Sequence, residues 1–182
     1  MPLPQGAKPH DLPTGTIRNL RHSERPQFRA HLLRLDRESR RDRFNGPTSD
    51  NFVSTYAERC FHDGTLVIGY VEDGKVLGAA ELHECPGERV PTGEIAFSVE
   101  RGLQHRGIGS RLFARLIETA LSFGYEELRV TTHPQNETMK RLARKFDAAL
   151  RFEDGATVGV IALLPQPPLA RGMAETVRAP HI

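Results

Sequence analysis

A short glycine-containing turn is the segment of this sequence whose residue types could bind an anion. Residues 104–110 read QHRGIGS, and the two glycines, Gly107 and Gly109, lie at the start of an apolar-periodic helix. The free amides and the dipole at a helix N-terminus favour a negative charge, typically a phosphate. Glycine lets such a group approach the backbone without a side chain in the way. A plain tight turn entering a helix can carry the same glycines, so the turn alone leaves both interpretations open.

Two common phosphate-binding motifs do not fit this turn. A P-loop needs Gly-Lys followed by Ser or Thr, whereas this sequence has Gly109-Ser110-Arg111. A dinucleotide-binding fingerprint needs a third glycine three residues after the second, where Leu112 stands. The pattern that remains is Gln/Arg-x-x-Gly-x-Gly/Ala.

The turn lies between a predicted strand and a predicted helix. Residues 94–100 alternate in polarity, with Ile95, Phe97 and Val99 on one face, which is typical of a half-buried strand. Residues 109–123 carry apolar pairs every four residues, and Gly124 is suited to end that helix. We therefore expect the anion-binding turn to belong to a strand–turn–helix unit.

The other elements predict an α/β domain with a mixed sheet. A strand at 16–20 precedes a helix that Ser23 is expected to cap, and Asp73-Gly74 predicts a hairpin turn. We expect the domain to span residues 16–163, between tails at 1–15 and 164–182 that are proline-rich or lack periodicity. The remaining predicted elements are helices at 49–60 and 136–146 and strands at 66–71, 76–82, 127–132 and 158–163, with an extra short strand near 150–152.

Composition excludes several classes of protein. The chain has 182 residues, 38% of them hydrophobic and 26% charged, which is typical of a soluble globular domain. It has no apolar run of about 18 residues, so we expect no membrane partner. The net charge of +2 argues against a dedicated nucleic-acid binder, although residues 21–44 hold eight arginines and four acids. Cys60 and Cys85 form no zinc pattern, so we expect free thiols, no metal and a cytoplasmic location.

The glycine turn and three other segments together resemble the GNAT superfamily of acyl-CoA-dependent N-acyltransferases. The similarity covers the predicted domain, which looks in particular like the acetyltransferase domain of bacterial protein lysine acetyltransferases. Besides residues 104–110, it rests on Glu94 at the opening of a strand, on LDRESRRDRF at 35–44 and on NETMKRLARK at 136–145. The resemblance implies a mixed, mostly antiparallel central sheet flanked by helices.

The resemblance also implies acetyl-CoA, or another acyl-CoA, as the co-substrate. The pantetheine arm would follow the backbone of Phe97, Ser98 and Val99, with the Val99 amide near the thioester oxygen. Asn136 would touch the cofactor as well as cap its own helix. The pyrophosphate would lie on the amides of His105, Arg106, Gly107, Ile108, Gly109 and Ser110, and the Arg106 side chain either adds a charged contact or stays solvated.

The implied reaction moves an acetyl or short acyl group to a primary amine, a protein lysine being one such acceptor, by direct attack. Only a neutral amine has the lone pair for this attack, so a carboxylate is the expected proton acceptor, directly or through a water. Glu94 matches the subgroup's catalytic glutamate, with Glu81 and His83 as alternatives. The arginines of residues 21–44 are expected to flank the acceptor cleft unless they only form a solvated face. A homodimer is compatible with this assignment.

Two positions depart from the family pattern. Ala143 stands where many members have a tyrosine that protonates the leaving thiolate, so the thiolate must leave unprotonated or take its proton elsewhere. Asp147-Ala148 replaces the usual Gly-Phe after the same helix. The lysine-acetyltransferase subgroup also tends to lack the tyrosine, so that gap supports the subgroup, and an intact Glu94 favours an enzyme. Asp147-Ala148 leaves room for a second class of function, a CoA-binding sensor without turnover. An arginine-rich binding module is the third class, which the near-neutral charge disfavours.

Overall fold

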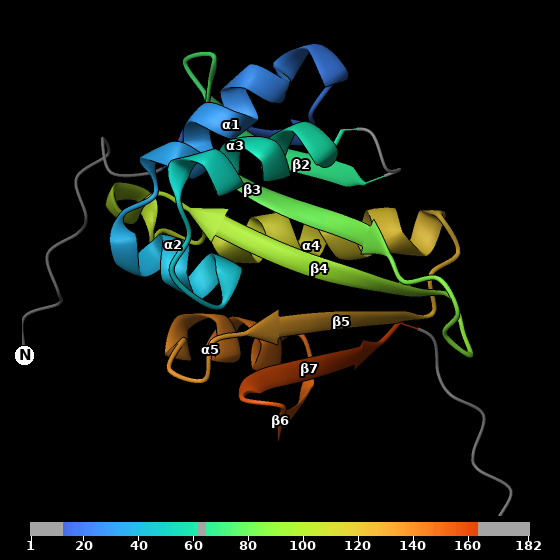
Figure 1. Ribbon diagram of the computed structural model, residues 1–182. Helices are drawn as coiled ribbons and strands as arrows, with labels where there is room; N and C mark the ends of the chain where they lie inside the picture. Colours follow the sequence, from blue (N-terminus) through green and yellow to red (C-terminus); the bar gives the residue numbers. More distant parts are fainter. Residues whose placement is uncertain (1–12, 62–64, 164–182) are drawn as a thin grey trace, which may run out of the picture.

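The computed structural model describes residues 13–61 and 65–163, arranged around one seven-stranded sheet (Figure 1). The predicted tails therefore lie largely outside the described residues, at 1–12 and 164–182. Neighbouring strands are antiparallel except for β4 and β5, which confirms the predicted mixed, mostly antiparallel sheet. Its order is β1 (Thr16–Asn19), β2 (Leu66–Glu72), β3 (Lys75–Glu84), β4 (Thr92–Val99), β5 (Glu127–Thr132), β7 (Ala156–Ala162), β6 (Ala149–Glu153).

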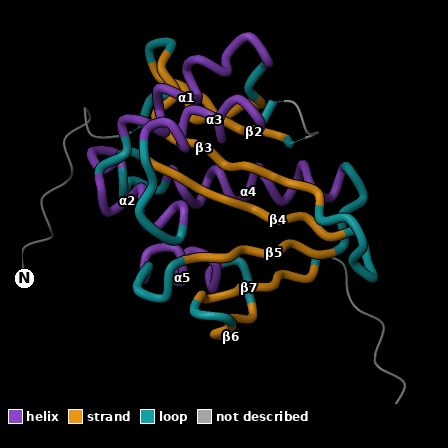
Figure 2. The backbone as a smooth tube through the Cα atoms, in the orientation of Figure 1, coloured by secondary structure: helices purple, strands orange, loops and turns teal. Residues whose placement is uncertain are grey.

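In the described residues, helices cover both faces of this sheet (Figure 2). The helices α1 (Arg25–Arg34) and α3 (Asp50–Arg59) pack on one face, where Val67 and Ala79 join their apolar side chains. The long helix α4 (Ile108–Ser122) packs on the opposite face, against Ile68 and Ala80. Alternate residues of β2 and β3 thus enter two different cores, as the period of a strand requires. The other two helices, α2 (Arg37–Phe44) and α5 (Glu137–Lys145), lie beside the ends of β4 and β5.

The first helical region differs from its prediction. A short 3₁₀ helix, η2 (His22–Glu24), precedes α1, and Glu24 rather than Ser23 occupies the N-cap position. The sequence analysis also did not predict α2 as a separate helix. That helix is almost entirely polar, so it has no apolar period to detect, but Asp36 caps it by accepting hydrogen bonds from the Glu38 and Ser39 amides at 3.1 Å.

The structure confirms the predicted turns at Asp73-Gly74 and Gly124. Asp73 and Gly74 both have positive φ, 49° and 72°, and connect β2 to β3 as the hairpin prediction requires. Gly124, with a φ of 81°, follows the end of α4. Asp147 has a φ of 60°, so it adopts the left-handed conformation that a glycine would favour after α5. The replacement of the family's Gly-Phe therefore preserves this helix end.

The pairing of β4 with β5 ends before either strand does. Their parallel register runs from Thr92 opposite Glu127 to Ile95 opposite Val130, while β4 continues to Val99. Beyond Ile95 the two strands diverge toward α2 and α5, as Figure 1 shows. In the described part of the chain, the β4 edge from residue 96 to 99 has strand partners on the β3 side alone.

Three stacked phenylalanines connect the elements around this divergence. Phe97 of β4 stacks on Phe113 of α4 with ring centroids 4.7 Å apart, and Phe113 stacks on Phe146 with centroids 4.3 Å apart. The planes of neighbouring rings are within 8° of parallel. Phe146 follows the last residue of α5, so one continuous stack joins β4, α4 and α5.

Removal of the middle ring should destabilise the domain. Phe113 is fully buried, so Phe113→Ala should lower the free energy of unfolding by about 3–5 kcal/mol. Urea unfolding followed by circular dichroism measures this change. Phe152, which is 70% exposed on β6, is the matched control, and its alanine variant should change stability by less than about 0.5 kcal/mol. Equal losses at the two positions would contradict the bracing role of the stack.

Candidate active site

A cavity of about 490 Å³ opens where β4 leaves β5. Its walls come from α2, from the end of β4, from the turn that precedes α4 and from the start of α5. Six of the eleven predicted site residues line it, which are Phe97, Ser98, Val99, His105, Gly109 and Asn136. A second cavity of about 690 Å³, near Cys85 and Tyr125 at the other end of β4, contains none of the predicted site residues.

The turn before α4 holds its backbone in left-handed conformations. His105 has a φ of 60° and Gly107 a φ of 81°, and Gly107 is the N-cap of α4. A Cβ atom at Gly107 would meet nothing within 4 Å, so the space over this helix start is open. Gln104 fixes the turn because its side-chain amide donates to the Val99 carbonyl at 3.0 Å and to Ser39 Oγ at 3.1 Å. A 15-residue helix thus directs its positive end toward open space.

The free edge of β4 forms a second part of the cavity wall. Phe97, Ser98 and Val99 pair with Ala80, Ala79 and Gly78 of β3, which leaves their other edge unpaired by β5. Backbone amides and carbonyls on such an edge can bind an extended ligand that carries amide groups of its own. The cavity therefore offers backbone hydrogen-bonding groups at two places, a strand edge and a helix start.

Asn136 occupies the capping position that was predicted for it. Its Oδ1 accepts a hydrogen bond from the Met139 amide at 2.9 Å, and its Nδ2 donates to Thr132 Oγ1 at 2.9 Å. These two bonds orient the side chain between the end of β5 and the start of α5. The predicted capping role is confirmed, and a ligand contact by Asn136 remains a prediction.

The predicted base, Glu94, is exposed near the start of β4 and does not line the cavity. It lies opposite His83 in the β3–β4 register and on the same sheet face as Ser98. Four residues along a strand correspond to roughly 13 Å, so Glu94 and Ser98 cannot touch one reacting atom at the same time. Four other predicted site residues also lie outside the cavity wall, which are Arg106, Gly107, Ile108 and Ser110.

Glu81, one of the alternative bases, is a wholly buried ion-paired carboxylate. Its oxygens receive hydrogen bonds from Arg43 at 2.6 Å and from the Tyr56 hydroxyl at 2.5 Å, and His83 Nε2 lies 3.2 Å away. Burial alone would raise the pKa of Glu81, but the adjacent Arg43 charge holds it well below the usual range. A carboxylate held this strongly in its ionised form is a poor proton acceptor at neutral pH.

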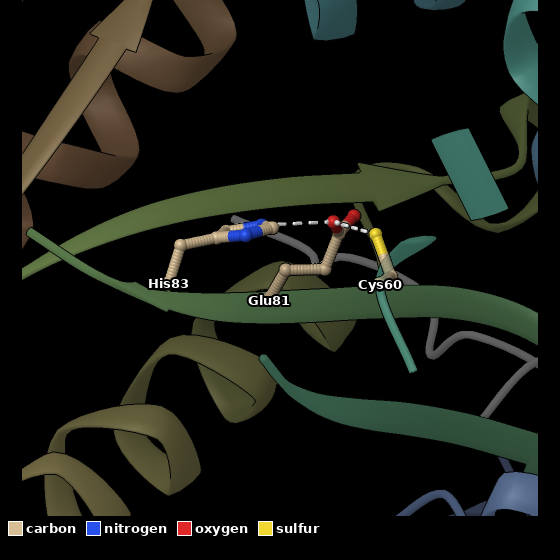
Figure 3. Close-up of side chains that lie close together, drawn as sticks. All are labelled: Cys60, Glu81 and His83. Carbon is tan, nitrogen blue, oxygen red and sulfur yellow. Dashed lines mark hydrogen bonds and ion pairs between the residues drawn. The ribbon is translucent and has the colours of Figure 1, made fainter. Parts of the chain in front are cut away.

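Figure 3 shows that Cys60 and His83 meet Glu81 from opposite sides. The Cys60 thiol donates to Glu81 Oε2 at 3.5 Å, and the three side chains have the donor types of a metal site. Burial, and then the Glu81 charge, raise the pKa of the Cys60 thiol, so the sulfur stays protonated. Because Arg43 already neutralises the carboxylate through Oε1 and the Tyr56 hydroxyl donates to Oε2, the cluster suits an ion pair better than a metal ion.

The arginine-rich segment is largely neutralised by neighbouring acids, and the expectation that it flanks an acceptor cleft stays a prediction. Of its residues, α2 places Glu38, Ser39, Asp42 and Arg43 in the cavity wall. The paired arginines are Arg25 and Arg29 with Glu58, Arg34 with Glu100, Arg40 with Asp50, Arg41 with Asp42 and Arg43 with Glu81.

One chain of polar residues beside the cavity was not predicted. His31 of α1 is fully buried, with Nε2 at 2.8 Å from Ser98 Oγ and Nδ1 at 3.1 Å from Glu100 Oε1. Arg34 also donates to this Glu100 oxygen, at 2.8 Å. Burial lowers the pKa of His31 more strongly than Glu100 raises it. His31 and Ser98 are 67 residues apart, and no sequence motif connects them.

Comparison with known proteins agrees with this geometry. The profile of the Acetyltransferase (GNAT) family matches residues 19–148. The GNAT domain of PAT from S. lividans superposes with a TM-score of 0.69 at 19% identity, over 80% of this chain and 89% of that one. A GNAT superfamily phosphinothricin acetyltransferase from Sinorhizobium meliloti, in complex with acetyl-CoA, superposes with a TM-score of 0.62 at 16% identity, over 82% and 88% of the two chains.

A third similar structure is the PaiA N-acetyltransferase from Thermoplasma acidophilum in complex with coenzyme A. It superposes with a TM-score of 0.61 at 16% identity, over 81% of this chain and 98% of that one. In the described part of this chain, no helix has the length and hydropathy that a membrane span requires.

The buried Arg43–Glu81 pair gives a prediction about stability and pH. Arg43→Met should lower the free energy of unfolding by about 3–5 kcal/mol, because it leaves a buried carboxylate without its countercharge. The matched control is Arg41→Met, which removes a more exposed arginine and should cost about 1 kcal/mol or less. Urea unfolding measures both.

The stability of the native protein and that of Arg43→Met should depend on pH with opposite signs. In the native protein the pKa of Glu81 is lower folded than unfolded, so its contribution to stability is present above about pH 4.3 and is lost as the pH falls. Without Arg43, burial should raise the folded pKa above the unfolded one, so acidification from neutral pH should recover part of the loss. Parallel pH profiles for the native and Arg43→Met proteins would contradict this account.

Proposed function

Because this chain belongs to the acetyltransferase (GNAT) family of acyl-CoA-dependent N-acyltransferases, we propose that it transfers an acetyl or other short acyl group to a primary amine by direct attack. A protein lysine is one acceptor of this class. The observation that carries the proposal is the cavity at the divergence of β4 from β5, which joins a free strand edge to the open start of α4.

In this proposal acyl-CoA occupies the two backbone surfaces of the cavity. The pantetheine arm has amide groups that match the free edge at Phe97, Ser98 and Val99, with the Val99 amide near the thioester oxygen. The pyrophosphate lies over the amides of residues 105–110, where Gly107 leaves open space and the helix dipole favours negative charge. Arg106 is exposed beside this position and can add a charged contact.

The acceptor reaches the thioester as an amine that must first lose a proton. A primary ammonium has no lone pair, so a base has to remove one proton before the attack. Glu94 is exposed on the sheet face that also carries Ser98, at roughly 13 Å along the strand, so it acts through intervening water.

The cofactor site predicts a specific loss of affinity. Gly107→Glu should weaken CoA binding by at least about tenfold, because it places a carboxylate where the pyrophosphate lies. Gly124→Glu is a close control, since Gly124 has the same φ of 81°, the same open surroundings and a position at the other end of α4. Isothermal titration calorimetry on both folded variants makes the comparison. Unchanged affinity in Gly107→Glu would exclude this site for the pyrophosphate.

The role of Glu94 predicts a loss of rate without a loss of binding. Glu94→Gln should keep the affinity for acetyl-CoA and lower turnover by roughly 10²–10⁴-fold, the usual contribution of a general base. The loss should shrink as the pH rises, because more of the amine is already neutral. Release of free thiol from acetyl-CoA, measured against a panel of proteins and small amines, tests this.

A matched carboxylate controls for charge in the same assay. Glu84 lies at the end of β3 and alternates onto the other sheet face, so Glu84→Gln should retain native turnover. Full activity of Glu94→Gln at neutral pH would remove Glu94 from the mechanism. Binding of acetyl-CoA by the native protein without turnover of any amine would favour a sensor over an enzyme.

A further inference from the structure

The chain Ser98–His31–Glu100 has the order and the distances of a proton relay. Ser98 lines the cavity and its hydroxyl lies 2.8 Å from His31 Nε2, while His31 Nδ1 lies 3.1 Å from the Glu100 carboxylate. His31 is fully buried, and the Ser98 residue is 7% exposed. The relay therefore runs from the cavity wall into the layer between β4 and α1, where water has little access.

The hydrogen bonds define how protons are distributed along this chain. A carboxylate only accepts, so the Nδ1–H of a neutral His31 donates to Glu100. His31 Nε2 then carries the lone pair and accepts the proton of the Ser98 hydroxyl. The Ser98 oxygen keeps its own lone pairs available to a donor in the cavity. The chain thus presents a proton acceptor at the cavity, backed by an imidazole base.

We propose that Ser98, His31 and Glu100 carry a proton from the attacking amine to the departing CoA sulfur. This inference rests on the proposed function and adds a step to it. Glu94 lies too far from Ser98 to accept a proton at the thioester itself, and none of the three tyrosines, Tyr56, Tyr70 and Tyr125, lines the cavity. The relay supplies the proton transfer at the thioester that neither Glu94 nor a tyrosine is placed to carry out.

With this relay, each proton of the reaction has a donor and an acceptor. Glu94, through water, removes the first proton from the ammonium and releases it to solvent. As the amine nitrogen bonds to the thioester carbon, its second proton passes to Ser98 Oγ while the Ser98 proton passes to His31 Nε2. The carbon–sulfur bond then breaks, and the proton returns through Ser98 to the thiolate. The products are the amide, CoA as a free thiol and a regenerated neutral His31.

The charges that face His31 suit this transient protonation. Glu100 contacts its ring, and Arg34 binds the same Glu100 oxygen, so the carboxylate is held in place. Glu81 on β3 is a more distant negative charge, largely neutralised by Arg43. Burial, opposed by Glu100, keeps the resting imidazole neutral at physiological pH, which a base requires. Ser98 is the catalytic residue of this relay. His31 accepts the proton of Ser98, and Glu100 holds His31 in position.

A titration of bound CoA tests the relay without any acceptor. CoA is bound to the native protein and to the Ser98→Ala and His31→Gln variants, and its thiol is titrated by the ultraviolet absorbance of the thiolate. In the native complex the thiol can pass its proton through Ser98 to His31, and the imidazolium that forms stabilises the thiolate, so the thiol pKa should be lower than in both variants by about one unit, a tenfold shift. Thr119→Val, which removes a buried hydroxyl at the far end of α4, should match the native value.

Turnover with a weakly basic amine gives the second readout. Methoxyamine stays uncharged well below neutral pH, so its acetylation from acetyl-CoA does not depend on prior deprotonation. Native turnover should fall at acidic pH as His31 becomes protonated, whereas both variants should be slower by roughly 10²-fold and lack this acidic limb. Circular dichroism confirms folding, and Ser98→Ala provides the milder variant if His31→Gln unfolds.

The outcomes separate the relay from the proposed function. A bound thiol that titrates identically in the native protein and in a folded Ser98→Ala variant overturns the relay and leaves the acyltransferase assignment standing. A native protein that does not bind CoA overturns both. A lowered thiol pKa that disappears in both variants, but not in Thr119→Val, supports the relay.

Discussion

The early end of the ladder between β4 and β5 is the constraint on which the rest of the site depends. Because pairing stops at Ile95 and Val130, the last residues of β4 keep one edge free, and the start of α4 lies next to that edge. A sheet paired to its end would have used those backbone groups internally. The phenylalanine stack from β4 through α4 to Phe146 connects the elements around this divergence.

The sheet face under the first three helices buries polar side chains. The side chains of Glu81 and Ser98 both lie under the first three helices, and each is bonded to a helical residue, Arg43 or His31. Hydrogen-bonded and ionic contacts are directional, so they restrict the position of α1 and α2 more narrowly than apolar packing does. The side of the cavity next to α1 and α2 is therefore built from charged and polar groups in defined orientations, whereas the opposite face of the sheet relies on the apolar core under α4.

Sequence patterns predicted the parts of this structure that depend on neighbours along the chain. The Asp73-Gly74 hairpin, the glycine turn before α4 and the Asn136 cap each follow from local backbone preferences. Helix α2 was not predicted because it has no apolar face, although Asp36 was an available capping signal. The contact of His31 with Ser98 was not predicted because it joins a helix to a strand that lies 67 residues further along the chain. Only the packing of α1 on the sheet creates it.

The division of the cavity into backbone and side-chain walls has an evolutionary consequence. A main-chain amide is the same at every residue, so point substitutions rarely remove the hydrogen bonds of a strand edge or a helix start. The side chains that α2 contributes carry no such protection, and each substitution there changes the charge or shape of the wall. Divergence of the sequence can therefore leave the two backbone surfaces in place while it alters the wall that α2 forms.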